Sequence, residues 1–146
     1  MRRQLVLIAM LLFQTLGVGL QAVPALAVLT TDPERQVRDL PVIKKSILDA
    51  TRYEDFNLAV VIKDKQFVVT VINSKLNKAT SAEREAEASA IASTIAQETI
   101  KRPEFGSIIG IHINYVSGAS GASRAKIIDR IDFRKDRAGD YQPHKT

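Results

Sequence analysis

The sequence lacks cysteine and tryptophan, and aromatic residues make up only 5% of its 146 positions. Without cysteine the chain has no disulfide, no thiol nucleophile, no zinc ribbon and no iron–sulfur cluster. So few aromatic side chains also leave little material for the stacking surfaces that bind single-stranded nucleic acids. We therefore predict no metal, no cofactor and no nucleic-acid partner.

The familiar catalytic motifs are also absent. The two histidines, His112 and His144, are too far apart for the H-x-x-x-H spacing of zinc proteases. The sequence at Ser120 contains part of a nucleophile elbow, but Ala122 stands where the pattern needs glycine, and a strand pattern follows instead of a helix. No pair of carboxylates has a diagnostic spacing. The sequence therefore predicts no catalytic residues.

The first 27 residues have the pattern of a signal peptide. Arg2 and Arg3 precede an uncharged apolar run over residues 5–20, and Pro24 and a small-x-small sequence ending at Ala27 follow it. The run is shorter than the ~20 residues that a membrane-spanning helix prefers, which favours cleavage after Ala27 over an uncleaved anchor. We expect export to the periplasm or the medium, with membrane attachment only if the signal is kept.

The remaining chain has the length of a single domain that buries about two thirds of its unfolded surface. We predict a flexible lead over residues 28–40, one domain over residues 41–136 and an exposed tail over residues 137–146. The net charge of +5 falls to +3 when Arg2 and Arg3 are removed. Basic residues near the C-terminus alternate with acidic ones, which is typical of a solvated surface and not of a nucleic-acid site.

Hydrophobic periodicity predicts two helices and four strands. A helix is expected over residues 41–51, after one or two turns that Pro41 separates from it. Two β-branched runs, residues 58–62 and 67–72, predict a hairpin. Thr80 and Glu83 have the spacing of a capping box, and Pro103 ends the helix predicted over residues 81–102. Further strands are expected over residues 107–116 and 125–134, joined by a loop of small residues.

Strand alternation predicts which side chains share a face of the sheet. One set is apolar and is expected to face the helices: Phe67, Val69, Val71, Ile109, Ile111, Ile113 and Tyr115. In the last strand Ile127, Ile131 and Phe133 share an apolar face, and Arg130, Asp132 and Arg134 share the other. Asp129 falls among these apolar positions, which predicts a β-bulge or an edge position there. The fold class is therefore α+β, a two-layer sandwich in which helices cover one face of a mainly antiparallel four-stranded sheet.

The other face of the sheet is semi-apolar and is the predicted binding surface. Its central residues are Val68, Thr70, Ile72, His112 and Asn114. A face of this kind favours a protein partner or self-association, unless the N-terminal segment covers it. We therefore interpret the chain as a non-enzymatic binding or structural module.

Two further hypotheses concern small ligands and catalysis. The loop that contains Gly118, Ser120, Gly121 and Arg124 has the composition of an anion-binding loop. The alternative function is a small hydrolase or ligand-processing enzyme, in which His112 works with a nearby carboxylate, Asp129 or Asp132. This alternative requires His112 to lie within hydrogen-bonding reach of one of these carboxylates.

Overall fold

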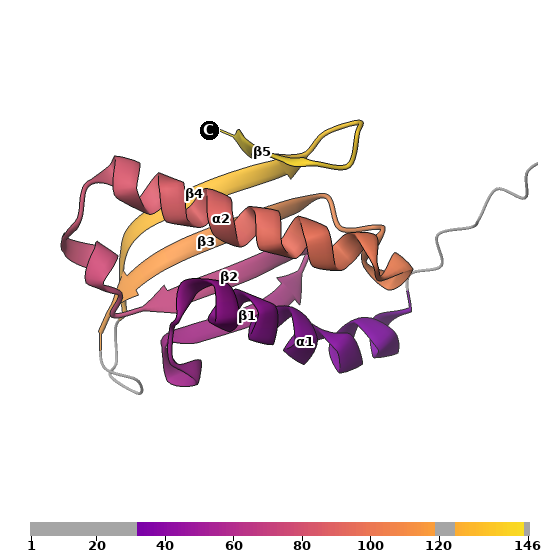
Figure 1. Ribbon diagram of the computed structural model, residues 1–146, viewed down its shortest axis with the longest axis horizontal. Coiled ribbons are helices and arrows are strands. Elements are labelled where there is room, and N and C mark those ends of the chain that lie inside the picture. Colours follow the sequence, from indigo (N-terminus) through magenta and orange to yellow (C-terminus); the bar gives the residue numbers. More distant parts are fainter. Residues whose placement is uncertain (1–31, 119–124, 145–146) are drawn as a thin grey trace, which may run out of the picture.

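The domain has two layers, with two helices packed on one face of a five-stranded sheet (Figure 1). The computed structural model describes residues 32–118 and 125–144. The predicted signal peptide, residues 28–31 of the lead and the tip of the small-residue loop lie outside the described residues. The α+β class and the sandwich are confirmed, but the sheet has one strand more than we predicted.

The first helix, α1 (Pro33–Thr51), begins earlier than the sequence indicated. The side chain of Asp32 caps it by accepting hydrogen bonds from the N–H groups of Glu34 and Arg35. The predicted break at Pro41 is wrong, since the helix continues through it. Pro41 lies on the exposed side, where water can bind the carbonyl group that loses its partner. Residues 33–40 are therefore helical.

The strands β1 (Leu58–Lys63) and β2 (Gln66–Ile72) form the predicted hairpin. Asp64 and Lys65 both have positive φ angles, 52° and 60°, so the two-residue turn is type I′. The next strands, β3 (Gly110–Ser117) and β4 (Lys126–Lys135), pair antiparallel as expected. The strand order is β1-β2-β3-β4-β5.

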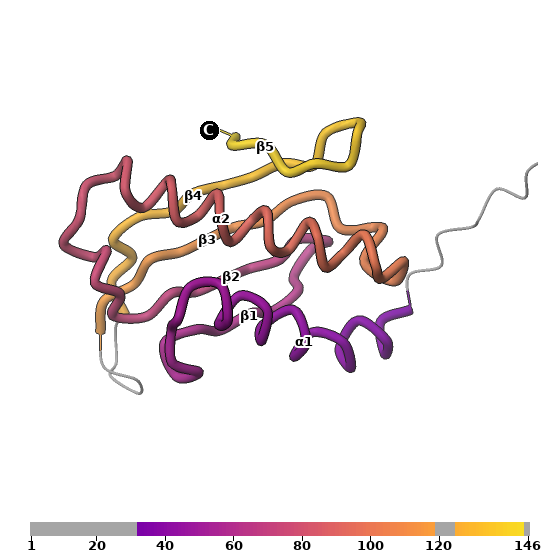
Figure 2. The backbone as a smooth tube through the Cα atoms, in the orientation of Figure 1, coloured from indigo at the N-terminus to yellow at the C-terminus, as the bar shows by residue number. Residues whose placement is uncertain are grey.

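The second helix, α2 (Ser81–Ile100), connects β2 to β3, which are parallel neighbours at the centre of the sheet (Figure 2). The sheet is therefore mixed, although its other pairings are antiparallel. The capping box at Thr80 and Glu83 is present as predicted. The buried stripe of α2 faces the sheet, and it consists of Ala88, Ile91, Ala92, Ile95 and Thr99.

The core lies between the helices and one face of the sheet. Most side chains that were predicted to face the helices are buried there, including Phe67, Val69 and Ile113. Ile109 was assigned to this face wrongly: it is 49% exposed, while its neighbour Ile108 is buried. The reason is that β3 begins only at Gly110, so the alternation does not extend back to these two residues.

The predicted bulge near Asp129 is confirmed, because the pairing of β3 with β4 shifts between Tyr115 and Val116. Asp129 points toward α2, where its carboxylate binds the Arg84 guanidinium at 2.7 Å. The bulge also moves Ile127 opposite Val116, so Ile127 is 60% exposed and does not share the buried face of Phe133 as predicted.

A polar network lies under the first half of α2. The hydroxyl groups of Tyr53 and Tyr115 donate hydrogen bonds to the Glu87 carboxylate at 2.8 Å and 3.0 Å. The Tyr53 hydroxyl also lies 2.6 Å from that of Ser74. Because burial penalises tyrosinate, the pKa values of Tyr53 and Tyr115 are raised, and the nearby Glu87 charge raises them further.

The predicted C-terminal tail instead contains a short strand, β5 (Tyr141–His144), which pairs antiparallel with the end of β4. Tyr141 is buried against the core, which explains why this polar segment folds onto the sheet. Neither α1 nor α2 has an apolar stretch long enough to cross a bilayer.

Candidate functional site

The predicted binding residues lie together on the sheet face opposite the helices. Val68 pairs with His112, and Thr70 pairs with Asn114, across the parallel junction of β2 and β3. Ile72 pairs with Val116 at the end of the same junction. These side chains are partly exposed, apart from Val116, which is buried. Among the described residues no helix packs on this face, which we call the open face (Figure 1).

A cluster of three ionisable side chains lies at the centre of the open face. His112 Nδ1 lies 2.5 Å from Asp132 Oδ1, and Arg130 Nε donates to the same oxygen at 2.8 Å. Arg130 Nη2 lies 2.9 Å from His112 Nδ1 and 3.4 Å from Nε2. Since Nδ1 donates to the carboxylate, it cannot also accept from arginine, so the guanidinium can donate only to Nε2. The cluster fixes both the ring and its tautomer.

The electrostatics of the cluster favour a charged Asp132. Partial burial alone would raise the pKa of this carboxyl group, but hydrogen bonds from Arg130 and His112 outweigh it, and the pKa is lowered. Asp132 is thus ionised at neutral pH, and its single negative charge balances that of the Arg130 guanidinium.

A shallow hollow of about 270 Å³ lies beside the cluster, at the turn between β1 and β2. Its lining joins the amide groups of Gln66 and Asn114 with the cationic groups of Lys63 and Arg130 and the carboxylate of Asp64. Val61, on β1, is 50% exposed on the same face and extends the surface with an apolar patch. The open face can therefore offer apolar contact, hydrogen-bond donors and positive charge to a ligand.

No protein family, curated protein or solved structure matches this chain significantly. The geometry of the open face is therefore what indicates a function. In that geometry Asp132 is the carboxylate that meets His112. Asp129, the other carboxylate considered for that role, lies on the helix side and is bound by Arg84.

The predicted anion loop is not brought together by the described residues. Ser120, Gly121 and Arg124 lie outside them. Gly118 has a φ of +149°, and its N–H donates to the Asn73 side chain at 3.0 Å. The backbone donor of Gly118 is therefore already used within the fold.

Sequence reasoning missed two members of the site. Asp132 was considered as a partner of His112, but the contact of Arg130 with both of them was not foreseen. The contacts of Arg130 and Asp132 with His112 depend on the register between β3 and β4, and this register shifts at the bulge. Lys63 was not among the predicted binding residues, although it belongs to the hollow beside His112. Within residues 32–118 and 125–144, no three acidic or histidine side chains converge as metal ligands.

Proposed function

We propose that the chain is exported and that its mature domain is a non-enzymatic binding module, which holds a protein partner against the open face. The observation that carries this proposal is a semi-apolar sheet face that the two helices leave uncovered. An isolated sheet face with apolar side chains is normally covered by another layer. The apolar run with Arg2 and Arg3 before it supports export.

The charges of the open face favour a partner segment that carries carboxylates. Lys63 and Arg134 form no ion pair with the described residues, and Arg130 and Asp132 neutralise one another. Lys63 shares its hollow with the Asp64 carboxylate, so the unopposed positive charge of the face is that of Arg134. Apolar contact with Val61 and Val68 would supply affinity, while the basic residues would steer and orient the partner.

The test uses the absence of cysteine. Thr70→Cys places a unique thiol on the open face, and Ala50→Cys places one on the exposed side of α1 as a control. We expect a thiol-directed crosslinker in intact cells to join one dominant protein, identified by mass spectrometry, to the first variant and not to the second. Adding Val68→Lys to Thr70→Cys should abolish the product, because it puts a charge into the apolar contact.

An equal yield of crosslinks at Thr70 and Ala50, or a yield that Val68→Lys leaves unchanged, would contradict binding through the open face. Crosslinks between two copies would identify self-association as the function of that face. Thermal unfolding of each variant by circular dichroism serves as the control for folding.

One observation favours a second function, a hydrolase. The contact between His112 Nδ1 and Asp132 has the geometry that orients a general base. Water would have to replace Arg130 Nη2, which lies 3.4 Å from Nε2. In this function His112 would take a proton from water, while Arg130 would stabilise the negative charge that develops on the substrate. The described residues provide no side-chain nucleophile hydrogen-bonded to His112, so the nucleophile would be water.

We expect the binding module to show no hydrolysis of p-nitrophenyl esters or phosphates above the level of its His112→Gln variant. A hydrolase would instead lose a rate of about 10²-fold or more in both His112→Gln and Asp132→Asn. A loss in both variants, with unchanged thermal unfolding, would replace the binding proposal by the second function.

A further inference from the structure

The outer edge of β4 is only half covered. β5 pairs with residues 132–135 of β4, and residues 126–131 have no strand on their outer side among the described residues. Natural proteins usually block or cover such an edge, because its unpaired backbone groups bind other strands. This stretch contains Ile127, Ile128 and Ile131, so it has the composition of a strand that accepts a neighbour.

The backbone direction identifies the groups that are free to pair. Lys135 donates its N–H to Ile109, toward the inside of the sheet, so alternate residues back along β4 do the same. The N–H of Arg130 therefore points outward, and it donates to the side chain of Asp129 at 2.9 Å. The Asp129 carboxylate therefore takes the place of the carbonyl group with which a neighbouring strand would accept this hydrogen bond.

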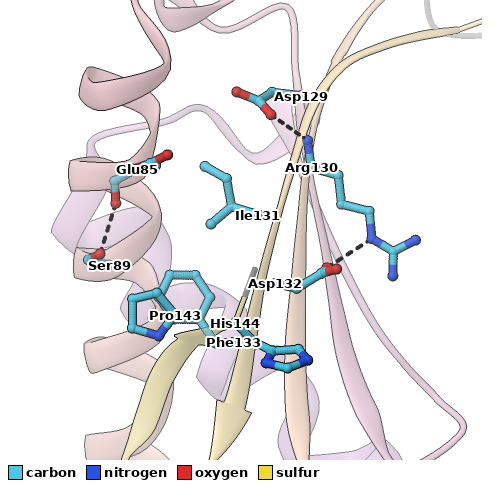
Figure 3. A pocket seen from close by; sticks show the side chains of 9 residues that line it. All are labelled: Glu85, Ser89, Asp129, Arg130, Ile131, Asp132, Phe133, Pro143 and His144. Atoms are coloured by element: carbon cyan, nitrogen blue, oxygen red, sulfur yellow. Dashed lines mark hydrogen bonds and ion pairs between the residues drawn. The ribbon is translucent and has the colours of Figure 1, made fainter. Parts of the chain in front are cut away.

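A groove of about 360 Å³ runs along the same edge, between α2 and β4 (Figure 3). Ile131 and Asp129 point into it from β4, and Glu85 and Ser89 form the opposite wall. Pro143 of β5 closes one end. Strand addition needs such pockets, because alternate side chains of the added strand point to the same face.

The free charge of the groove is negative. Asp129 is neutralised by Arg84, whereas Glu85 is exposed and forms no ion pair with any described residue. We propose that this edge binds an extended segment of a partner protein as an additional strand, antiparallel to β4 and in line with β5, with basic and apolar side chains in the groove. This proposal goes beyond the open face and does not depend on it.

A second copy of the chain fits the edge less well. Antiparallel pairing of two β4 edges would place both α2 helices on the same side of the joined sheet. The Glu85 side chains of the two copies, and their neighbours Glu83, would then approach each other. Like charges in this position oppose association, so a partner that brings basic residues is favoured.

The probe is a fluorescein-labelled peptide of seven residues, Thr-Lys-Thr-Val-Thr-Lys-Thr, whose lysine and valine side chains share one face. Its binding is measured by fluorescence anisotropy. We expect saturable binding to the chain from residue 28 onward, with a shift of the Arg130 backbone amide in its NMR spectrum. A peptide with glutamate in place of lysine should not bind. Glu85→Lys should weaken binding about fivefold or more. The control is Glu54→Lys, the same charge change at an exposed position between α1 and β1, which should leave binding unchanged.

The decisive pair of variants is Arg130→Pro and Arg130→Ala. Both remove the side chain, but only proline removes the outward N–H, and proline is tolerated at a sheet edge. We expect Arg130→Ala to bind the peptide and Arg130→Pro to lose binding. Val68→Lys should leave peptide binding unchanged, which separates this edge from the open face.

Equal binding by the proline and alanine variants, or an Arg130 amide that does not shift, would overturn the proposal. If Arg130→Pro does not fold, Glu85→Lys and the amide shift decide the question. A dimer in sedimentation that the peptide dissociates would show that a second copy, and not a partner, occupies the edge.

Discussion

Raising the pH from 10 toward 12 is expected to unfold the domain, because all three tyrosines of the chain have raised pKa values in the folded state. Burial raises the pKa of Tyr53 and Tyr115 far above 10, and that of Tyr141 to about 12. Such a shift gives stability that is complete below the unfolded-state pKa and is lost as the pH rises toward the folded-state value. Tyr115 and Tyr141 are nearly inaccessible, so each should remove about 1.4 kcal/mol per pH unit. Tyr53 is partly exposed and should contribute less.

The measurement is tyrosinate absorbance during a pH titration, together with circular dichroism. The absence of tryptophan makes the tyrosinate signal easy to assign. We expect absorbance to rise in the same steep transition in which secondary structure is lost. Tyr141→Phe keeps the ring and should make the pH dependence of stability shallower by one tyrosine. Ionisation of all three tyrosines near pH 10, with the fold intact, would contradict the role of the buried network.

Replacing Phe67 by alanine is expected to lower the free energy of unfolding by about 3 to 5 kcal/mol. Phe67 is fully buried in the middle of the core, between its neighbours Ile62 on β1 and Ile111 on β3. Its ring lies 5.5 Å from that of Phe105, measured between centroids. The substitution removes this contact and leaves a cavity in a domain whose total stability is about 5 to 15 kcal/mol.

Phe56 provides a matched control, because the same substitution there removes a ring that is 74% exposed. We expect Phe56→Ala to change the free energy of unfolding by about 0.5 kcal/mol or less. Urea unfolding followed by circular dichroism measures both variants. Similar losses at the two positions would mean that Phe67 does not lie in the core that we describe.

The parts of the fold that local chemistry determines could be predicted from sequence. The side chains of Thr80 and Glu83 each accept a hydrogen bond from the other's backbone N–H, so residues of its first turn determine where α2 begins. The β1–β2 hairpin follows from two β-branched runs with a short turn between them. In both cases the interacting residues are close in sequence, and no distant partner is needed to explain the conformation.

The parts that depend on distant partners could not be predicted. β5 is polar in sequence and forms a strand because Tyr141 finds a place in the core beside α2 and β4. Pro41 is accommodated because burial of Ile43 and Ile47 in the next turns favours the continued helix over a break. The face of the sheet on which the Ile127 side chain lies depends on a bulge, and the pairing of β4 with β3 sets the position of that bulge.

The candidate site shows the same division. Alternation along β2 and β3 placed Val68, Thr70, His112 and Asn114 on one face, and the parallel pairing brings them side by side. The contact of His112 with Asp132 was only one of two possibilities, because alternation cannot choose a register between strands. Once β3 and β4 are paired, the opposite charges of Arg130 and Asp132 bring these side chains together beside His112.

The parallel pairing of β2 with β3 has a consequence for how the chain folds. These central strands can pair only after the whole α2 connection between Ile72 and Gly110 has been drawn together, which costs loop-closure entropy before any sheet contact repays it. Assembly should therefore be slow compared with that of helical bundles. Slow assembly is compatible with the export that we propose, and the β1–β2 hairpin, whose strands are adjacent in sequence, should form before the parallel pairing.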